Sequence, residues 1–395
     1  MKKVKVAVVK VSDYKGEEIS AGLKKALALI GGLEKIIKRQ SKVFVKINHL
    51  SPSSLPEKGI VTHPVFTREV LRLLMEFDLE ITVGDDIHSR QQDGFLYTGY
   101  RQICEELGVR LVNLKERGFR EIDCNGKLLR KVYVSPLVLE ADYILNLPKL
   151  KTHSFTAFTG AVKNMFGIIP QGLRLEYHRN YINSDVFCQM LVDIFSCTPR
   201  QLTIMDGIAA MEGEGPSGGN VKKVGLIFAS QDAVAVDAVA TKIVGFNPLN
   251  IYTTLHAHER GLGIGAIENI EIVGENIHDV QIKDFKRSAI AIGLFRRKIP
   301  SFLYAYLQYE LRLTPEVSRD KCTACLECVE ICPRQAVQLV QGFAWVDKKL
   351  CINCMCCHEV CQFQAIRLKQ RPIGRMIRRG GSVLRRLKSI LEPIK

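Results

Sequence analysis

The 395-residue chain lacks several features that mark large classes of protein. No apolar run approaches the roughly 20 residues that span a bilayer, which argues against an integral membrane protein. The N-terminus has no basic start followed by a long apolar core, so it does not resemble a secretory signal peptide, and residues 4–9 instead predict a short strand. We therefore expect a cytoplasmic protein.

Signatures for binding nucleotides and nucleic acids are also absent. No glycine-rich segment has the spacing of a Walker A loop or of the G-x-G-x-x-G fingerprint. Acidic residues are scarce relative to basic ones, 41 against 56, which gives a net charge of +15. No recognition motif or interleaved aromatic residues accompany this charge, so we expect no nucleic-acid partner.

Much of the positive charge lies at the end of the chain. Residues 367–395 carry ten Lys or Arg and a single acid, Glu392. Apolar residues recur there at helical spacing, which predicts a basic amphipathic tail over residues 371–395. Such a helix can bind an anionic membrane surface, bind an acidic protein partner, or pack on its own protein, and the sequence leaves these alternatives open.

Cysteine, in contrast, is abundant, and eight of the 13 cysteines form a repeated pattern. Two sets follow the spacing C-x-x-C-x-x-C-x-x-x-C: Cys322, Cys325, Cys328 and Cys332, then Cys351, Cys354, Cys357 and Cys361. In this pattern the first three cysteines bind one [4Fe-4S] cluster and the fourth binds the other. The sequence predicts two [4Fe-4S] clusters, one on Cys322, Cys325, Cys328 and Cys361 and one on Cys332, Cys351, Cys354 and Cys357.

The two halves also align outside the cysteines, as CTACLECVEICPRQAVQL and CINCMCCHEVCQFQAIRL. This duplication resembles bacterial dicluster ferredoxins and predicts a small α+β domain over residues 317–370. Two zinc sites or a disulfide framework are the alternatives, although zinc sites usually use separated C-x-x-C pairs. Gln362 in place of Pro333 and the extra Cys356 depart from the repeat without changing the ligand spacing. Trp345, between the halves, is predicted to pack over a cluster.

Four further cysteines lie outside the repeat and lack metal or disulfide spacing. In a reducing compartment they are expected to be buried thiols. They are Cys104, Cys124, Cys188 and Cys197.

Residues 1–298 alternate short β-rich runs with helical patterns, which is the rhythm of βαβ units. Strands are predicted at residues 4–9, 43–47, 81–83, 110–114, 143–147, 202–205 and 224–228, and helices at 17–37, 64–77 and 96–107. Asn125-Gly126 predicts a hairpin inserted in this scheme. The fold class is therefore α/β, a mostly parallel sheet covered by helices, joined by a linker at 299–316 to the ferredoxin-like domain.

Ligands of open α/β sheets bind beyond the carboxyl ends of the strands. Polar residues gather there, and cationic side chains among them can hold a phosphate or carboxylate, so we expect a site for a small anionic ligand. The candidate catalytic residues are Lys149, Lys151, His153, Asp85 and Asp206, and the candidate substrate-binding residues are Lys46, Asn48, Lys163, Asn164 and Glu212. A solvated basic loop beside a capped helix is the alternative.

Two other features bear on this site. Asp85, Asp86, His63 and Asp206 could bind a divalent metal or exchange protons, but they could equally cap helices and turns. The glycine-rich residues 213–219 predict a flexible loop that closes over a ligand.

These segments resemble a known family. NLPKLKTHSFTAFTGAVKNMFGIIP, GLRLEYH, DGIAAMEGEGPSGG and ASQDAVAVDAVATKIVGF, with KINHLSP, THP and VGDD before them, are similar to the domain of unknown function 362 family, often fused to a C-terminal dicluster ferredoxin. The resemblance covers about residues 40–275 and implies an architecture and a candidate site, but no substrate.

Two main hypotheses for function follow. In the first, the chain is an iron-sulfur oxidoreductase whose ferredoxin module passes electrons between a redox partner protein and a small anionic substrate in the α/β domain. In the second, it is an electron-transfer or docking subunit without its own substrate. Iron-sulfur sensing is a third possibility, because clusters need not transfer electrons.

Overall fold

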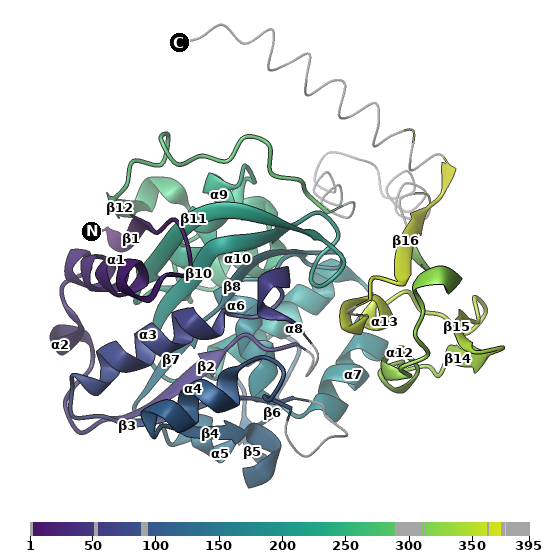
Figure 1. Cartoon of the computed structure of the whole chain (residues 1–395), viewed down its shortest axis with the longest axis horizontal. Helices are drawn as coiled ribbons and strands as arrows, with labels where there is room; N and C mark the ends of the chain where they lie inside the picture. The colour runs from purple at the N-terminus through teal and green to yellow at the C-terminus, as the bar shows by residue number, and fades with distance from the viewer. Residues whose placement is uncertain are drawn as a thin grey trace, which may run out of the picture.

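The computed structural model describes residues 3–50, 54–87, 94–288, 313–361 and 363–372, together with Glu310 and Met376. It consists of an α/β body and a smaller C-terminal module that packs against one side of it (Figure 1). Among the described residues, no helix is long and apolar enough to cross a bilayer.

A ten-stranded sheet runs through the body. Its strands are β1 (Val4–Lys10), β2 (Lys42–Ile47), β3 (Glu80–Asp85), β4 (Arg110–Asn113), β7 (Tyr143–Leu147), β8 (Lys149–His153), β9 (Ala157–Phe158), β10 (Gln201–Glu212), β11 (Asn220–Ser230) and β12 (Ile270–Gly274). Their order is β12-β1-β11-β10-β7-β2-β3-β4, with β8 pairing to β10 and β9 to β8. The predicted mostly parallel sheet is confirmed, except that β11 runs antiparallel to both β1 and β10 and the short β9 runs antiparallel to β8.

Helices cover both faces of this sheet. They are α1 (Gly16–Leu29), α2 (Leu33–Ile36), α3 (Pro64–Met75), α4 (Tyr100–Leu107), α5 (Pro136–Leu139), α6 (Ala161–Asn164), α7 (Gln171–Asn180), α8 (Ser184–Ser196), α9 (Ala233–Ile243) and α10 (Tyr252–Glu259). Short 3₁₀ turns lie at Pro56–Lys58, Leu114–Arg117, Met165–Ile168, Pro248–Asn250, Ile267–Asn269 and Arg319–Lys321. The helix predicted at 17–37 is broken because Gly31 and Gly32 adopt positive φ angles of 115° and 93°.

The alternation of side chains along the strands builds the core on both sides. In β2, Val43 and Val45 pack in one apolar cluster with α1 and α3, whereas Phe44 packs in the opposite cluster with α8. Successive residues of a strand point to opposite faces, so a strand covered on both sides is apolar throughout. A separate hairpin, β5 (Arg120–Asp123) with β6 (Lys131–Val134), confirms the turn predicted at Asn125-Gly126.

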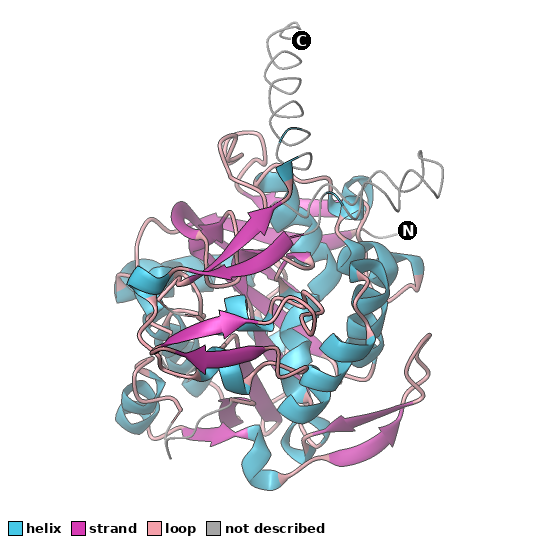
Figure 2. Ribbon diagram, turned by 90° about the vertical axis from the view of Figure 1, so that its right-hand side faces the viewer, coloured by secondary structure: helices cyan, strands magenta, loops and turns pink. Residues whose placement is uncertain are grey.

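The C-terminal module is a small α+β unit seen face on in Figure 2. It contains β13 (Leu313–Val317), α12 (Glu327–Glu330), β14 (Val337–Val340), β15 (Phe343–Val346), α13 (Cys356–Val360) and β16 (Ile366–Gln370). Two antiparallel pairs form, β13 with β16 and β14 with β15. β13 begins within the predicted linker, whereas residues 299–309 and 311–312 of that linker, and residues 373–375 and 377–395 of the predicted tail, lie outside the described residues.

Candidate functional site

The two predicted sets of cluster ligands line two separate cavities in the C-terminal module. One cavity, of about 360 Å³, is lined by Cys322, Cys325, Cys328 and Cys361. The other, of about 310 Å³, is lined by Cys332, Cys351, Cys354 and Cys357. In each set the fourth cysteine comes from the opposite repeat, as the rule for crossed ligation requires.

The loops around these cavities share an unusual backbone. Ala324 and Leu326 have positive φ angles of 55° and 68°, and Asn353 and Met355, at the equivalent positions of the second repeat, have 54° and 67°. This conformation costs a non-glycine residue of order 1–3 kcal/mol and persists only where the surroundings hold it. Both loops are therefore bent in the same way, which fits two equivalent clusters.

Backbone N–H groups also point at the cysteine sulfurs in a repeated manner. The N–H of Ala336 donates to Cys332 Sγ at 3.2 Å, and the N–H of Ala365 donates to Cys361 Sγ at 3.3 Å. Hydrogen bonds to sulfur are one of the ways in which a protein adjusts the potential of an iron-sulfur cluster.

Within each set the described thiols are neither bonded in pairs nor gathered around one point. All eight cysteines are free, and among the described residues no three His, Cys, Asp or Glu side chains lie close enough to share one metal ion. A zinc site needs four ligands about 2.0–2.3 Å from a single ion, whereas a [4Fe-4S] cube binds each thiolate to a different iron and spreads the sulfurs apart.

The prediction that Trp345 covers a cluster is wrong. Its side chain is 45% exposed on β15, while the preceding Ala344 is buried and lines the first cluster cavity. The N–H of Ala344 donates to Cys322 Sγ at 3.3 Å. Alternation along the strand therefore turns Ala344 toward the cluster cavity and Trp345 toward solvent.

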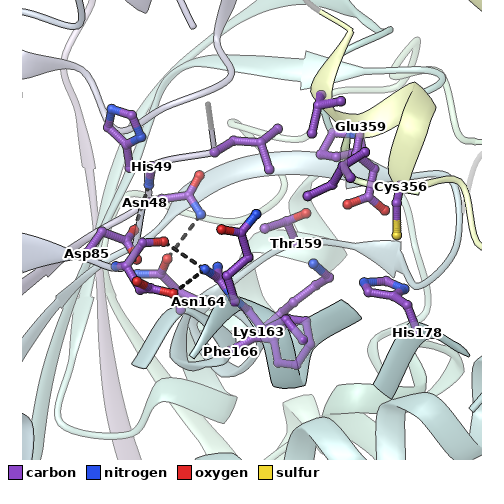
Figure 3. Close-up of a pocket in the computed structure, with 18 of the residues that line it drawn as sticks. Asn48, His49, Asp85, Thr159, Lys163, Asn164, Phe166, His178, Cys356 and Glu359 are labelled. Carbon is purple, nitrogen blue, oxygen red and sulfur yellow. Dashed lines mark hydrogen bonds and ion pairs between the residues drawn. The ribbon is translucent and has the colours of Figure 1, made fainter. Parts of the chain in front are cut away.

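A third cavity lies between the α/β body and the C-terminal module, beyond the carboxyl ends of β2 and β3 (Figure 3). Its volume is about 970 Å³, including the part open to solvent. The body contributes Lys46, Asn48, His49, Leu50, Asp85, Asp86, Lys151, Thr159, Lys163, Asn164, Phe166, Gly167, Gln171, Arg174, Leu175, His178 and Pro216, and the module contributes Glu327, Ile331, Cys356, Glu359 and Val360.

This interface cavity contains only some of the predicted site residues. Those that line it are Lys46, Asn48, Asp85, Lys151, Lys163 and Asn164. Those that do not are Lys149, His153, Asp206 and Glu212. Arg174, Glu359 and Cys356 also line the cavity but are not among the residues predicted from the sequence, because they come from segments far from the strand ends.

A buried ion pair occupies one end of the interface cavity. Lys46 Nζ lies 2.8 Å from Asp85 Oδ2, which also accepts the N–H of His49 at 2.9 Å. Burial lowers the pKa of Lys46 and raises that of Asp85, and each charge partly offsets the shift of the other. A side chain at Gly167 would collide with both groups, so the backbone must approach them without a Cβ.

Three asparagines form a chain beside this pair. Asn48 Nδ2 donates to Asn164 Oδ1 at 3.0 Å, and Asn164 Nδ2 donates to Asn146 Oδ1 at 2.8 Å. Asp237 of α9 fixes the start of α6, which carries Asn164, by accepting the N–H of Ala161 at 2.6 Å. Burial raises the pKa of Asp237 to about 7. Asp237 is not among the site residues predicted from the sequence, because its positioning role depends on the packing of α9 against α6.

Five buried polar atoms around the cavity have no hydrogen-bond partner within the described structure. They are Asn48 Oδ1, His49 Nδ1, Thr159 Oγ1, Arg174 Nε and His178 Nδ1. Figure 3 shows Asn48 and His49 toward one end of the cavity, and His178 and Glu359 toward the other. Buried polar groups are nearly always hydrogen-bonded, so these atoms mark a place for a polar ligand.

Two of the cavity cations have no carboxylate within 4.0 Å among the described residues, namely Lys151 and Lys163. Lys151 Nζ donates to the carbonyl of Ile60 at 2.6 Å, and Lys163 Nζ lies 5.9 Å from the centroid of the Phe166 ring. Burial, helped by the charge of Lys163, lowers the pKa of Lys151 to about 7. The other two cations are paired, Lys46 with Asp85 and Arg174 with Asp86, so Lys151 and Lys163 are the cavity cations left for an anion to contact, although the more distant Glu359 carboxylate also acts on both.

The glycine-rich loop predicted to close over a ligand contributes Pro216 to the lining of the interface cavity and also contacts the C-terminal module. It connects β10 to β11, and the carbonyl of Glu214 lies 3.0 Å from His358 Nε2. Ser217 Oγ donates to the carbonyl of His358 at 3.0 Å, and a side chain at Gly218 would collide with the His358 ring. His153 Nε2 and Glu359 Oε1, 3.2 Å apart, join the two modules at a further point.

Lys149 and Asp206 belong to a separate buried group. Their charged atoms are 2.7 Å apart, and the hydroxyl of Tyr14 donates to Asp206 Oδ1 at 2.8 Å. The ring of His63 stacks on Tyr14 at 3.7 Å between centroids. Residues 149–153 form a strand rather than the expected loop, so Lys149, His153 and the two cavity lysines do not surround one pocket. Glu212, which was predicted to bind substrate, lies outside the interface cavity and accepts the N–H of Lys286 at 2.9 Å.

Comparison with known proteins agrees with this architecture. Residues 43–242 match the family described as a domain of unknown function, DUF362, and residues 314–337 match a 4Fe-4S binding domain. The chain belongs to the DUF362 family. It carries a 4Fe-4S binding domain at its C-terminal end.

One curated relative is a thylakoid-associated protein of Synechocystis sp., 29% identical over 265 residues, or 67% of this chain and 81% of the relative. Two solved structures are more distant: a Thermotoga maritima protein (16% identity, TM-score 0.35) and the lactate racemase apoprotein of Thermoanaerobacterium thermosaccharolyticum (14%, TM-score 0.39). The two alignments cover 52% and 59% of this chain. They cover 53% and 55% of the solved chains, so this chain spans about half of the length of each. Likeness at this level carries no statement about activity.

Proposed function

We propose that the protein is an iron-sulfur oxidoreductase that holds two [4Fe-4S] clusters and exchanges electrons with a small anionic substrate in the interface cavity. One observation carries the proposal: the helices that bear cluster cysteines also form a wall of that cavity. Cys356, Glu359 and Val360 of α13 line it, and α13 contains the ligand Cys357 and is followed by the ligand Cys361.

The first cysteine repeat also contributes side chains to this wall. Glu327 and Ile331, at or beside α12, line the cavity from positions equivalent to those of Cys356 and Val360. Both repeats therefore border the same space. Since a [4Fe-4S] cluster passes single electrons, two clusters beside one cavity support a reaction that moves a pair of electrons to or from one substrate.

The side chains of the body would bind and orient that substrate. Lys163 and Lys151 would hold its anionic group, and Thr159 and His178 would hydrogen-bond its polar atoms. Burial lowers the pKa of His178 to about 4, so the imidazole is neutral at pH 7. Lys151, with its pKa lowered to about 7, could donate or accept the proton that accompanies electron transfer.

The test uses protein purified without oxygen from its own host. Native mass spectrometry should show the mass of two clusters. The reduced protein is then mixed with a panel of small carboxylates and oxoanions, and reoxidation of the clusters is followed by visible absorption. We expect at least one anion to reoxidise the clusters, and Lys163→Met to slow this reaction about tenfold or more, since a buried charge contact is typically worth at least 1.5 kcal/mol.

Lys222→Met is the matched control. Lys222 lies on β11 outside the cavity and pairs with Asp284, so this substitution should leave the rate unchanged. Equal rates for all three proteins with every anion would contradict the proposal. That result would favour an electron-transfer subunit without its own substrate.

Association of residues 371–395 with an anionic membrane or an acidic partner remains a proposal, as does a separate redox partner protein. The name of the thylakoid-associated relative supports a membrane contact. Sedimentation with anionic vesicles should be lost when residues 377–395 are removed, and retention without them would argue against the tail as the contact.

A further inference from the structure

A pair of cysteines outside the cluster module lies unusually close together. Cys124 Sγ and Cys197 Sγ are 2.9 Å apart, although 73 residues separate them in the chain. A disulfide bond is about 2.05 Å long, so the two sulfurs need to move less than about 1 Å to reach bonding distance. Both are free thiols in the structure.

The surrounding hydrogen bonds hold the two segments in this arrangement. Cys124 follows β5, and its N–H donates to the carbonyl of Arg130 at 2.7 Å. Cys197 follows α8, and both sulfurs lie within 3.4 Å of the carbonyl oxygen of Asp193. The Asp193 carboxylate accepts the N–H of Leu128 at 2.7 Å, which ties the hairpin turn to α8.

One thiol of the pair is accessible and the other is the more acidic, because the hydrogen bond between them raises the pKa of Cys197. Cys124 is buried, whereas Cys197 is partly exposed, so a small reagent in solution can reach Cys197. The hydrogen bond from Cys197 lowers the pKa of Cys124 to about 7. A thiolate at neutral pH is the species that takes part in thiol-disulfide exchange.

We propose that Cys124 and Cys197 form a reversible disulfide by exchange with a low-molecular-weight disulfide. The two protein thiols lose two electrons and two protons, the S–S bond of the small disulfide breaks, and two molecules of small thiol are released, so no further oxidant is needed. The expectation of a buried thiol is confirmed for Cys124, whereas Cys197 is partly exposed. The proposal is independent of the clusters and of the substrate.

The bond would act on the wall of the interface cavity through α8. It would join the β5–β6 hairpin to the C-terminal end of this helix. Near its N-terminal end, α8 carries Phe187, whose ring lies 4.5 Å from that of His178 in the cavity lining. Oxidation would therefore fix the helix that supports one side of the cavity.

The experiment uses the full chain with its clusters, kept free of oxygen and equilibrated in buffers with graded ratios of glutathione disulfide to glutathione. Free thiols are then alkylated, and tryptic peptides are analysed by mass spectrometry, with visible absorption as the check that the clusters stay intact. We expect peptides 121–127 and 180–200 to become cross-linked as the ratio rises, and to separate when thiol is restored.

Variants identify the residues involved. Cys124→Ser and Cys197→Ser should each abolish the cross-link, whereas Cys188→Ser should retain it, because Cys188 lies in the same tryptic peptide as Cys197 but is not its neighbour. The proposal is overturned if both thiols of the wild-type protein stay alkylatable at the most oxidising ratio. It is also overturned if Cys197 forms only a mixed disulfide with glutathione, or if the cross-link depends on Cys188.

Discussion

Lys151 is the residue in the interface cavity whose protonation bears most directly on ligand binding. It is 1% exposed and donates to a carbonyl, but has no carboxylate partner among the described residues. Burying a charge without a counter-charge is costly, and this cost lowers its pKa to about 7. An anion bound beside it would supply the missing counter-charge.

Anion binding should therefore weaken as pH rises through about 7. The bound anion favours protonated Lys151. Above about pH 7 Lys151 is mostly neutral in the free protein, so anion binding must be accompanied by uptake of a proton and becomes weaker. Between about pH 6 and about pH 8 we expect a tenfold loss of affinity for a small oxoanion, measured by calorimetry. Lys151→Gln should remove this dependence, and an unchanged dependence in that variant would show that another group is responsible.

Pairs of cysteine substitutions test the crossed ligation. Cys322→Ser combined with Cys361→Ser removes two ligands of one cluster and should leave about half of the iron and sulfide. Cys322→Ser combined with Cys332→Ser removes one ligand from each cluster and should lose nearly all of both. Uncrossed ligation would give the opposite result, so elemental analysis of the two variants decides between them.

Single residues differ in how far the sequence predicts them. The cluster cysteines could be predicted because binding a [4Fe-4S] cluster requires this spacing of cysteines along the chain. Lys46 and Asp85 could be predicted because they end adjacent parallel strands. Glu359 and Tyr14 could not, because their contacts depend on how distant segments pack, and neither has a local pattern that signals a site.

At the scale of elements, the loop between β10 and β11 and helix α13 form the joint between the two modules. Gly218→Val should loosen this joint, because the added side chain would collide with His358. We expect faster amide hydrogen exchange in residues 356–361 and no change in α1. Gly172→Ala is the control, since a Cβ there meets nothing within 4 Å. Unchanged exchange in α13 would show that the joint does not depend on this contact.

The elements also show where sequence patterns lose information. The ends of buried parallel strands such as β2 and β7 were predicted within one or two residues, because short apolar runs of that length are typical of buried strands. β8 was expected to be a loop because its sequence, KLKTH, is polar, and only its buried ion pairs and carbonyl contacts permit a strand there. The direction of β11 is not encoded in its composition.

At the scale of the whole molecule, the C-terminal module has a small core. Among the described residues, its main apolar cluster contains six buried members, Cys328, Val337, Ala344, Val346, Cys357 and Ile366. Domains of this size generally need a metal or disulfides to stay folded. The left-handed residues in both cysteine loops add a further cost that the clusters would have to offset.

Removal of iron by a chelator should therefore unfold the module and leave the body folded. Hydrogen exchange should rise throughout residues 313–372 and in the β10–β11 loop, and stay low in β2 and β7. An unchanged exchange pattern in the module would mean that its strands hold without the clusters. The same experiment should expose His153 and Lys163 to chemical modification, because α13 covers that side of the cavity.

Because two modules form the interface cavity, family members with and without the C-terminal module should differ in this cavity. The span that matches the family, residues 43–242, provides the lysines and asparagines, but Glu327, Ile331, Cys356, Glu359 and Val360 come from outside it. A member without such a module would keep the floor of the cavity and lose a wall. Exchanging modules between members would then change the shape of the cavity together with the iron-sulfur domain.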